Sequence, residues 1–449
     1  MFKSLIKGSV KLVQRYLPEP FIFAIILTFI AFLVAMPICK QTPVDVLMNW
    51  GDGVWSLLAF SMQMAMVLVC GSVLADAPSV KRGLSGLAKL PKTPISAIAT
   101  VTIVSSLACW LNWGFGLIVG VVFAKEIAKK LVGVDYRLLI ASAYSGFVVW
   151  HGGLSGSIPL ALATKGDSLS EVTMGIVTEP IPISKTILAF NNILIVVAVI
   201  IAITIVNSLM HPKKGEIIAI NKKLLIEIEE EKQEITNTPA DKAERSVLLS
   251  IVLSLLGLSY LIIKLFFKGG SFDLNTIIML FLFLGIILHK RPIDYVRSFS
   301  KSAVSSAGIM LQFPFYAGIM GIMVGVSESG TSLAGEISNA CIAISNPTTF
   351  PILSFLSAGI VNIFIPSGGG QWVVQAPIMM PAGASLGVSP AVTGMTIAWG
   401  DAWTNLIQPF WAIPALGIAK LGAKDIMGFC LIDLLVTGVI ICLGLLIWV

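Results

Sequence analysis

Residues 93–132 read TPISAIATVTIVSSLACWLNWGFGLIVGVVFAKEIAKKLV, an apolar stretch interrupted by asparagine and glycine at positions 112–116. The stretch is long enough to enter the membrane twice, since one helical crossing takes about 20 residues. Lysine and arginine flank it on both sides, and basic loops of membrane proteins remain in the cytoplasm. Both ends therefore lie on one side, and the sequence predicts a re-entrant helical hairpin with its tip at 112–116.

The composition indicates that this hairpin belongs to a polytopic membrane protein. The 449 residues are 56% hydrophobic and 12% charged, with a mean hydropathy of +0.92, which is more apolar surface than a water-soluble domain buries. Uncharged runs of about 20 residues recur and period-2 alternation is absent, so we expect an all-α fold and not an outer-membrane barrel. The run at 17–37 has full span length, and we interpret it as an uncleaved first helix.

Charge and cysteine usage exclude several classes of function. The net charge of +6 is explained by basic residues in cytoplasmic loops, so it does not indicate a nucleic-acid partner. The cysteines have no metal-ligand spacing, and we expect neither a disulfide nor a metal site. The few histidines and cysteines provide no nucleophile and base that would indicate an enzyme, and no cofactor is expected.

The spacing of several residues indicates an internal duplication. Three pairs lie 249 residues apart: Pro43 and Pro292, Asp45 and Asp294, Gln63 and Gln312. Three glycine pairs follow at a spacing of 254: Gly114 and Gly368, Gly116 and Gly370, Gly146 and Gly400. The longer spacing implies one small insertion. A duplicated membrane protein is usually a transporter.

The basic loops predict the topology, with the amino terminus in the cytoplasm. The predicted units are a first repeat at 1–210, a charged cytoplasmic linker at 211–245, a connecting transmembrane helix at 246–264 and a second repeat at 265–449. Because the connecting helix crosses once, the second repeat is inverted and the carboxyl terminus lies outside. Each repeat contains a re-entrant hairpin, at 93–132 and 349–387, and a broken helix, at 136–164 and 389–419. Topologies in which each hairpin makes two full crossings keep the same parity and remain open.

Four breaks rich in Gly, Pro, Ser and Asn fall inside apolar segments, at 112–116, 151–157, 366–370 and 400–408. Irregular backbone at membrane depth is tolerated only where it is buried in protein or lines a wet cavity, and helix amino termini at that depth suit an anion. We therefore predict a substrate site, although close helix packing is an alternative explanation for such breaks. The predicted substrate-binding residues are Asn112, Trp113, Gly114, Gly116, Ser155, Ser157, Ser367, Gly368, Gly369, Gly370, Asn405 and Gln408.

Ionisable residues inside the spans are few: His151, Asp401 and, at a shallower position, Asp433. A charge at the bilayer centre costs about 2.5–3.5 kcal/mol on insertion scales, so such residues are functional candidates. We predict a coupling-ion site of Asp401, His151, Asn362 and Thr404, in which Asp401 carries a proton or helps to bind Na+. The alternatives are that Asp401 caps a half-helix and that His151 is a satisfied core residue. Asp433 has no break beside it and is expected to pair structurally.

Five stretches of the chain resemble a known family. They are WGDG at 50–53, LNWGFG at 111–116, QFPFYAG at 312–318, IPSGGG at 365–370 and QPFWA at 408–412. Together they resemble the bacterial short-chain fatty acid uptake permeases of the acetoacetate and butyrate type, in the ion transporter superfamily. The resemblance implies a homodimer in the inner membrane, built from inverted repeats, whose mobile transport domain contains both hairpins and moves as an elevator against a scaffold domain.

The expected substrate is therefore a small monocarboxylate such as acetate, butyrate or acetoacetate. Each buried methylene contributes at most about 0.8 kcal/mol, so discrimination by tail length should be shallow. Moving one negative charge inward against an inside-negative potential costs about 2.3 kcal/mol per 100 mV, so uptake needs at least one co-transported cation, H+ or Na+. The alternatives are a transporter of another small carboxylate in the same superfamily and a facilitative monocarboxylate channel.

Overall fold

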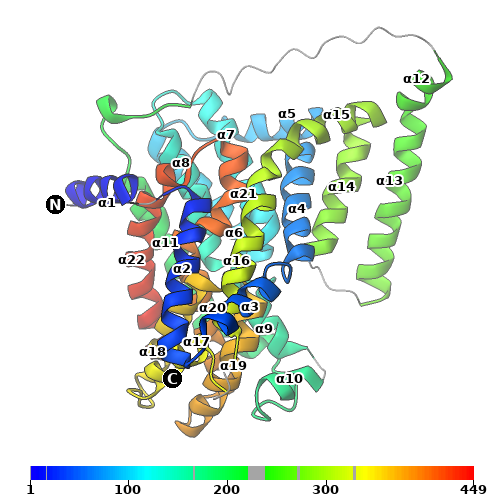
Figure 1. The fold of residues 1–449 in the computed structure, drawn as a ribbon. Coiled ribbons are helices and arrows are strands. Elements are labelled where there is room, and N and C mark those ends of the chain that lie inside the picture. Colours follow the sequence, from blue (N-terminus) through cyan, green and yellow to red (C-terminus); the bar gives the residue numbers. More distant parts are fainter. Residues whose placement is uncertain are drawn as a thin grey trace.

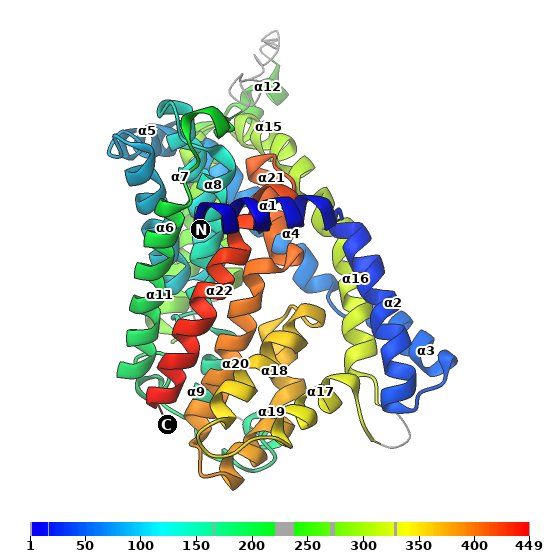
Figure 2. The same ribbon diagram turned by 90° about the vertical axis from the view of Figure 1, so that its left-hand side faces the viewer.

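The computed structural model describes residues 2–16, 18–164, 167–220, 238–269, 274–326 and 330–448. Every regular element in these ranges is a helix, which confirms the all-α prediction (Figures 1 and 2). Seven of the described helices are long and apolar enough to cross a membrane. They are Pro20–Cys39, Pro94–Leu111, Tyr136–Ala163, Phe190–Leu209, Val247–Phe267, Ala307–Val324 and Ala423–Trp448. The chain is therefore a multi-pass membrane protein.

The first part of the chain runs from α1 to α11. Its helices are α1 (Phe2–Tyr16), α2 (Pro20–Cys39), α3 (Pro43–Gly53), α4 (Leu58–Asp76), α5 (Pro78–Leu87), α6 (Pro94–Leu111), α7 (Trp113–Lys130), α8 (Tyr136–Ser145), the 3-10 helix η1 (Gly146–Gly152), α9 (Ser157–Ala163), α10 (Asp167–Val172) and α11 (Phe190–Leu209). The predicted linker at 211–245 contains the short helix α12 (Pro239–Glu244), and its acidic run lies largely at 221–237, outside the described residues. The connecting helix is α13 (Val247–Ile262), which continues as a π-turn over Ile263–Phe267.

The second part of the chain runs from α14 to α22. Its helices are α14 (Leu274–His289), α15 (Pro292–Ala303), α16 (Ala307–Val324), α17 (Leu333–Ile342), α18 (Phe350–Phe364), α19 (Gly368–Ser385), α20 (Pro390–Thr404), the 3-10 helix η7 (Asn405–Ile407), α21 (Pro409–Ala419) and α22 (Ala423–Trp448). Several helices begin at the spacing seen in the sequence: α3 and α15 at 43 and 292, α4 and α16 at 58 and 307, α8 and α20 at 136 and 390. The order of helices in the first part thus recurs in the second. The inverted relation between the two parts stays a prediction.

At each predicted hairpin the structure has a pair of helices joined at the expected break, and their re-entrant course stays a prediction. In the first pair, Asn112 ends α6 in extended backbone and caps α7, where its Oδ1 accepts from Phe115 N at 3.0 Å. Gly116 allows the two helices to touch, because a Cβ there would lie 2.2 Å from the backbone N of Cys109. In the second pair, Ser367 caps α19 by accepting from the N–H of Gly370 at 3.3 Å. Side chains that cap a helix inside an apolar segment therefore define both tips.

The structure adds short helices that the sequence analysis left outside the spans, among them α1, α3 and α5. Each contains polar residues among apolar ones, so it lies beside the spans and does not extend them. The Ser9 hydroxyl of α1 donates to the Gly428 carbonyl of α22 at 2.6 Å. A Cβ at Gly428 would lie 2.6 Å from the Cα of Val10, so α1 packs directly on the start of α22.

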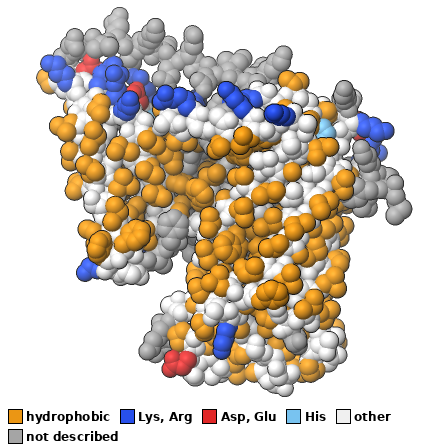
Figure 3. All heavy atoms as spheres, turned by 180° about the vertical axis from the view of Figure 1, so that it is seen from behind, with side chains coloured by type: hydrophobic (Ala, Val, Ile, Leu, Met, Phe, Trp, Pro, Cys, Tyr) orange, Lys and Arg blue, Asp and Glu red, His pale blue; other side chains and the backbone are white. Residues whose placement is uncertain are grey.

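The surface of the molecule has apolar flanks and one basic end. Figure 3 shows hydrophobic side chains over the flanks of the molecule and Lys and Arg gathered along one end, the end at which Figure 1 places α5 and α15. Large apolar side chains such as Phe29, Leu33 and Leu256 are 64%, 62% and 68% exposed. An exposed apolar belt with basic residues at one end is the surface expected for a protein in a bilayer.

Candidate functional site

The first hairpin tip contacts the break in the first broken helix. The N–H of Trp113 donates to the Ser155 hydroxyl at 2.9 Å, and the N–H of Leu154 donates to the Trp110 carbonyl at 2.8 Å. A Cβ at Gly153 would lie 2.2 Å from that same carbonyl oxygen. Glycine at 153 therefore permits the backbone contact, and the chain at 153–155 supplies partners for backbone groups that the hairpin tip leaves free.

The second hairpin tip contacts the same broken helix. A Cβ at Gly368 would lie 2.5 Å from Cε1 and 2.6 Å from Nε2 of His151, and 3.1 Å from the ring of Trp150. His151 and Trp150 belong to η1, the 3-10 segment in which the break at 151–157 begins. Both tips therefore meet one short piece of chain at 150–155.

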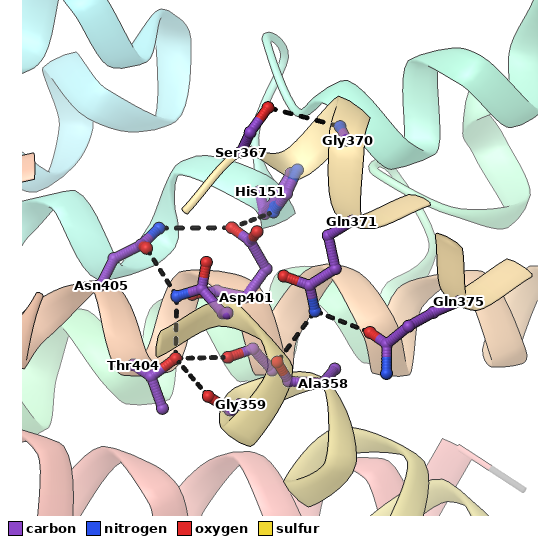
Figure 4. Close-up of polar contacts among 12 residues, drawn as sticks. His151, Ala358, Gly359, Ser367, Gly370, Gln371, Gln375, Asp401, Thr404 and Asn405 are labelled. Atoms are coloured by element: carbon purple, nitrogen blue, oxygen red, sulfur yellow. Dashed lines mark hydrogen bonds and ion pairs between the residues drawn. The ribbon is translucent and has the colours of Figure 1, made fainter. Parts of the chain in front are cut away.

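His151 and Asp401 form the centre of the site (Figure 4). His151 Nδ1 lies 3.1 Å from Asp401 Oδ1, and both side chains are fully buried. The imidazole stacks on Trp150 with ring centroids 3.6 Å apart. Nδ1 has no hydrogen-bond partner by geometry among the described residues, so the contact is a close approach of the two buried groups. The prediction that these two distant residues share one site is consistent with this contact, whereas their coupling role stays a prediction.

Asn362 connects the second hairpin to the second broken helix. Its Nδ2 lies 2.9 Å from the Asp401 carbonyl, 2.8 Å from Thr404 Oγ1 and 2.8 Å from Asn405 Oδ1. Asn405 in turn donates to Asp401 Oδ1 at 3.3 Å, and the Thr404 hydroxyl donates to the Gly359 carbonyl at 3.0 Å. All four residues predicted for the coupling-ion site therefore lie in one buried network, together with Asn405.

Gln408 extends the network along the hairpin. Its Nε2 donates to the Ile363 carbonyl at 2.7 Å, within the last turn of α18. The hydroxyl of Tyr144 in α8 donates to the carbonyl oxygens of Asn405 and Gln408. Sequence reasoning missed Tyr144, because a tyrosine in an apolar segment gives no signal of which carbonyl its hydroxyl meets. Its contacts join the first broken helix to the second.

The remaining predicted substrate residues have different surroundings. Gly114 and Gly116 lie buried in the first turn of α7, and the contact with Cys109 accounts for Gly116 by helix packing alone. Ser157 is the first residue of α9. A Cβ at Gly369 would meet no atom within 4 Å, so this residue faces open space. The structure therefore favours the packing explanation for Gly116 and leaves Gly369 free to approach a ligand.

Several buried acceptor atoms in the network, and Gln371 Oε1 beside it, lack a hydrogen-bond partner among the described residues. They are Asp401 Oδ2, Asn362 Oδ1, Gln408 Oε1 and Gln371 Oε1. Buried polar atoms are normally paired, so an unpaired set marks where a ligand, ion or water belongs. Oxygen acceptors suit a cation, whereas a carboxylate needs donors such as the first N–H groups of a helix. Within the described residues no group of three or more His, Cys, Asp or Glu forms a metal cluster.

Aromatic rings line one side of the hairpin tip. The Trp113 ring lies 5.2 Å from Trp411 and 6.0 Å from Trp150, centroid to centroid, and Phe147 stacks on Trp150 at 5.6 Å. All four rings are at least 92% buried, Trp113 being 8% exposed. They give the polar network an apolar wall, which suits a ligand with one polar end and a hydrocarbon tail.

These features define a class of protein. Irregular helices whose breaks converge on buried polar groups inside a membrane are the site architecture of secondary transporters. The chain belongs to the short chain fatty acid transporter family, whose sequence profile matches residues 1–448. It is therefore a transporter of that family and not an enzyme.

Two relatives cover nearly the whole chain. A protein of Escherichia coli (strain K12) is 43% identical over 437 residues, covering 97% of this chain and 97% of the relative. A protein of Haemophilus influenzae (strain ATCC 51907 / DSM 11121 / KW20 / Rd) is 42% identical over 438 residues, covering 96% and 97%. Both are provisionally named short-chain fatty acid transporters.

Among solved structures, the chain is similar to the YdaH transporter of Alcanivorax borkumensis. The match covers 96% of this chain and 98% of that one, with 15% sequence identity and a TM-score of 0.46. At this identity and score the likeness supports no argument about substrate or mechanism.

Proposed function

We propose that the protein takes up short-chain monocarboxylates of the acetate, butyrate and acetoacetate class across the bacterial inner membrane, together with H+ or Na+. Family membership supports the substrate class. The buried contact between His151 and Asp401 carries the coupling proposal, because it places the two ionisable groups of the broken helices 3.1 Å apart, against the second hairpin tip. Ionisable residues inside a membrane mark ion pathways in transporters.

The charge of the substrate explains why a cation is needed. Moving a monocarboxylate inward against an inside-negative potential costs about 2.3 kcal/mol per 100 mV, and one co-transported cation cancels this cost. Asp401 is the group that takes the cation, with its Oδ2 and with Asn362 Oδ1 as unpaired acceptors beside it. Thr404 and Asn405 hold these two side chains in place.

The substrate carboxylate is proposed to bind at the hairpin tips. The first turns of α7 and α19 start beside the chain at 150–155, and backbone N–H groups at a helix start attract an anion. The proposed contacts come from Asn112, Trp113, Gly114, Ser155, Ser157, Ser367, Gly368, Gly369, Gly370, Asn405 and Gln408. Of these, Gly369 has the most open surroundings. The aromatic wall would hold the hydrocarbon tail.

Transport requires the site to open, because His151, Asp401, Asn362 and Asn405 are all 0% exposed. We propose an elevator motion of a transport domain that carries both hairpins, in a homodimer built from inverted repeats at 1–210 and 265–449. The recurring helix order supports the repeats. The basic end of the molecule supports a cytoplasmic amino terminus and an external carboxyl terminus.

The test is uptake of radiolabelled butyrate into proteoliposomes that contain the purified protein, with a Na+ gradient or a pH gradient imposed separately. We expect uptake under one gradient in the wild type and its loss in Asp401→Asn. The matched control is Asp52→Asn, which removes an exposed carboxylate from α3 and should leave uptake intact.

The outcomes separate the alternatives. Uptake driven by the pH gradient and lost in Asp401→Asn makes Asp401 the proton carrier, whereas Na+-driven uptake assigns Na+ as the coupling ion. Uptake without saturation or counterflow would indicate a channel. Absence of butyrate uptake under both gradients would contradict the proposed substrate and favour another small carboxylate.

A further inference from the structure

A second buried carboxyl group lies away from the His151–Asp401 pair. Asp433, in the middle of α22, is 0% exposed. Neither of its carboxylate oxygens has a hydrogen-bond partner within 3.5 Å among the described residues, and no Lys, Arg or His of that part of the chain forms an ion pair with it. The expected structural pairing of Asp433 thus has no charged partner among the described residues and stays a prediction. An unpaired carboxylate in the membrane interior is unfavourable unless something neutralises it.

Three other helices supply polar groups around Asp433. The Ser145 hydroxyl, at the end of α8, faces the carboxyl group. The Asn207 amide of α11 donates to Ser145 Oγ at 2.9 Å and lies 3.3 Å from Thr102 Oγ1 of α6. All four side chains are 0% exposed. These contacts link Asp433, Ser145, Asn207 and Thr102 into one buried polar group, hereafter the Asp433 cluster.

The hydroxyl and amide hydrogens of this cluster already donate hydrogen bonds to other groups. The Thr102 hydroxyl donates to the Ile98 carbonyl at 2.9 Å, and the Ser145 hydroxyl lies 3.2 Å from the Ser142 carbonyl as a donor. Both amide hydrogens of Asn207 point to the two hydroxyl oxygens. If Ser145 turns its hydrogen to Asp433 instead, the carboxylate gains a single donor.

The acceptors of the cluster, in contrast, are in excess. Asn207 Oδ1 has no partner among the described residues, nor do the two oxygens of Asp433. Three unpaired acceptor oxygens therefore share at most one available hydrogen, that of the Ser145 hydroxyl. A bound cation would satisfy the acceptors that remain. Carboxylate, amide and hydroxyl oxygens are hard ligands, which favour a proton or an alkali cation over a soft metal.

We propose that the Asp433 cluster binds one monovalent cation from solution, Na+ or a proton. Asp433 supplies the charge, and Asn207 Oδ1 and the hydroxyl oxygens of Ser145 and Thr102 supply the remaining contacts. The other titratable groups near the cluster are Cys430 on α22 and Tyr144 on α8. Neither carries a positive charge, so neither neutralises Asp433.

The cluster is connected to the proposed transport site by adjacent residues of α8. Ser145 faces Asp433, and its neighbour Tyr144 donates to the carbonyl oxygens of Asn405 and Gln408 in the second broken helix. A shift of α8 on cation binding would therefore reach the residues around Asp401. This consequence rests on the proposed function: two cation sites would carry two positive charges inward with one carboxylate, which makes uptake electrogenic.

Cation binding is tested on the purified full-length protein in detergent. The unfolding temperature is measured while Na+ replaces choline at constant ionic strength, and the infrared spectrum is searched for the carbonyl stretch of a protonated carboxylic acid. Three variants are compared. The background is Asp401→Asn, which removes the other buried carboxylate. The second variant adds Asp433→Asn to this background, and the third adds Asp52→Asn as a control for an exposed carboxylate.

Either of two results supports the proposal. For Na+, the unfolding temperature of the background rises saturably with Na+, and Asp433→Asn abolishes the rise while Asp52→Asn keeps it. For a proton, Na+ has no effect, and the background shows a carboxylic acid band that Asp433→Asn lacks. The proposal is overturned if Asp433→Asn changes neither the Na+ response nor this band.

A second variant covers the case in which Asp433→Asn does not fold. Ser145→Ala keeps Asp433 and removes one contact, so it should weaken the Na+ response several-fold or shift the band. An unchanged response and an unchanged band would overturn the proposal. Failure of the proposed function can be told apart from failure of this proposal. Absence of butyrate uptake would contradict the proposed function only, because the Na+ response and the carboxylic acid band are measured without transport.

The electrical consequence is tested in proteoliposomes with an imposed inside-negative potential. Wild-type butyrate uptake should accelerate with the potential, and Asp433→Asn should lose that acceleration while retaining uptake. Uptake in the wild type that is independent of the potential would contradict cation movement through the Asp433 cluster.

Discussion

Replacement of Gly368 by alanine tests the contact between the second hairpin tip and His151. The new methyl group would lie 2.5 Å from Cε1 and 2.6 Å from Nε2 of His151, well inside contact distance. The imidazole has little room to move, because it stacks on Trp150 at 3.6 Å and faces Asp401 at 3.1 Å. Forcing an extra carbon into a packed site costs about 1–3 kcal/mol.

The adjacent glycine provides a matched control. A Cβ at Gly369 meets no atom within 4 Å, and both glycines lie in the first turn of α19. The same change there should alter the free energy of unfolding by no more than about 0.5 kcal/mol, as surface substitutions usually do. Comparing the two variants therefore isolates the contact with His151 from the general effect of alanine on the helix.

The assay is thermal unfolding of the purified protein, followed by butyrate uptake in proteoliposomes. We expect Gly368→Ala to unfold several degrees below Gly369→Ala and to transport more slowly than the wild type, because displacing His151 disturbs its contact with Asp401. Equal unfolding temperatures for the two variants would refute the placement of the second tip against His151.

Three further predictions follow from the same geometry. Asp401→Asn should lower the free energy of unfolding by about 1–3 kcal/mol, because it replaces the buried carboxylate that accepts from Asn405; an unchanged unfolding temperature would contradict this contact. Asn362→Ala should cost about 1–3 kcal/mol because it leaves buried groups of the second broken helix unpaired, and chemical unfolding of the purified protein measures this cost. Gly116→Ala should destabilise the first hairpin by clashing with the facing helix, whereas Gly51→Ala, which has no atom within 4 Å, should not; equal unfolding temperatures would contradict the close packing of α6 on α7.

Much of the fold was predictable from the sequence, because it depends on interactions between residues close along the chain. Apolar runs of span length predict the membrane helices, and the side chains of Asn112 and Ser367 cap the helices that start beside them. The spacing of 249 between positions 43 and 292 also recurs as the spacing of helix starts. The amphipathic helices α1, α3 and α5 were missed, because short mixed segments lack a strong hydropathy signal.

The site was predictable in its membership and less so in its contacts. The rarity of ionisable residues inside apolar segments singled out His151 and Asp401, and the structure brings them together. The same reasoning assigned Gly116 to the substrate, whereas its contact with Cys109 accounts for it by packing. Glycine in a break has the same signal in the sequence whether it faces a ligand or another helix.

The sequence by itself determined the class of protein, the helices and the positions of the breaks, since hydropathy and capping act within a few residues. Only the tertiary structure decided which polar groups meet. His151 and Asp401 are 250 positions apart, Tyr144 reaches carbonyl oxygens of the second broken helix, and Asp433 remains without a charged partner among the described residues. Such contacts depend on how whole helices pack against each other, and that packing is the sum of many weak interactions spread over the chain.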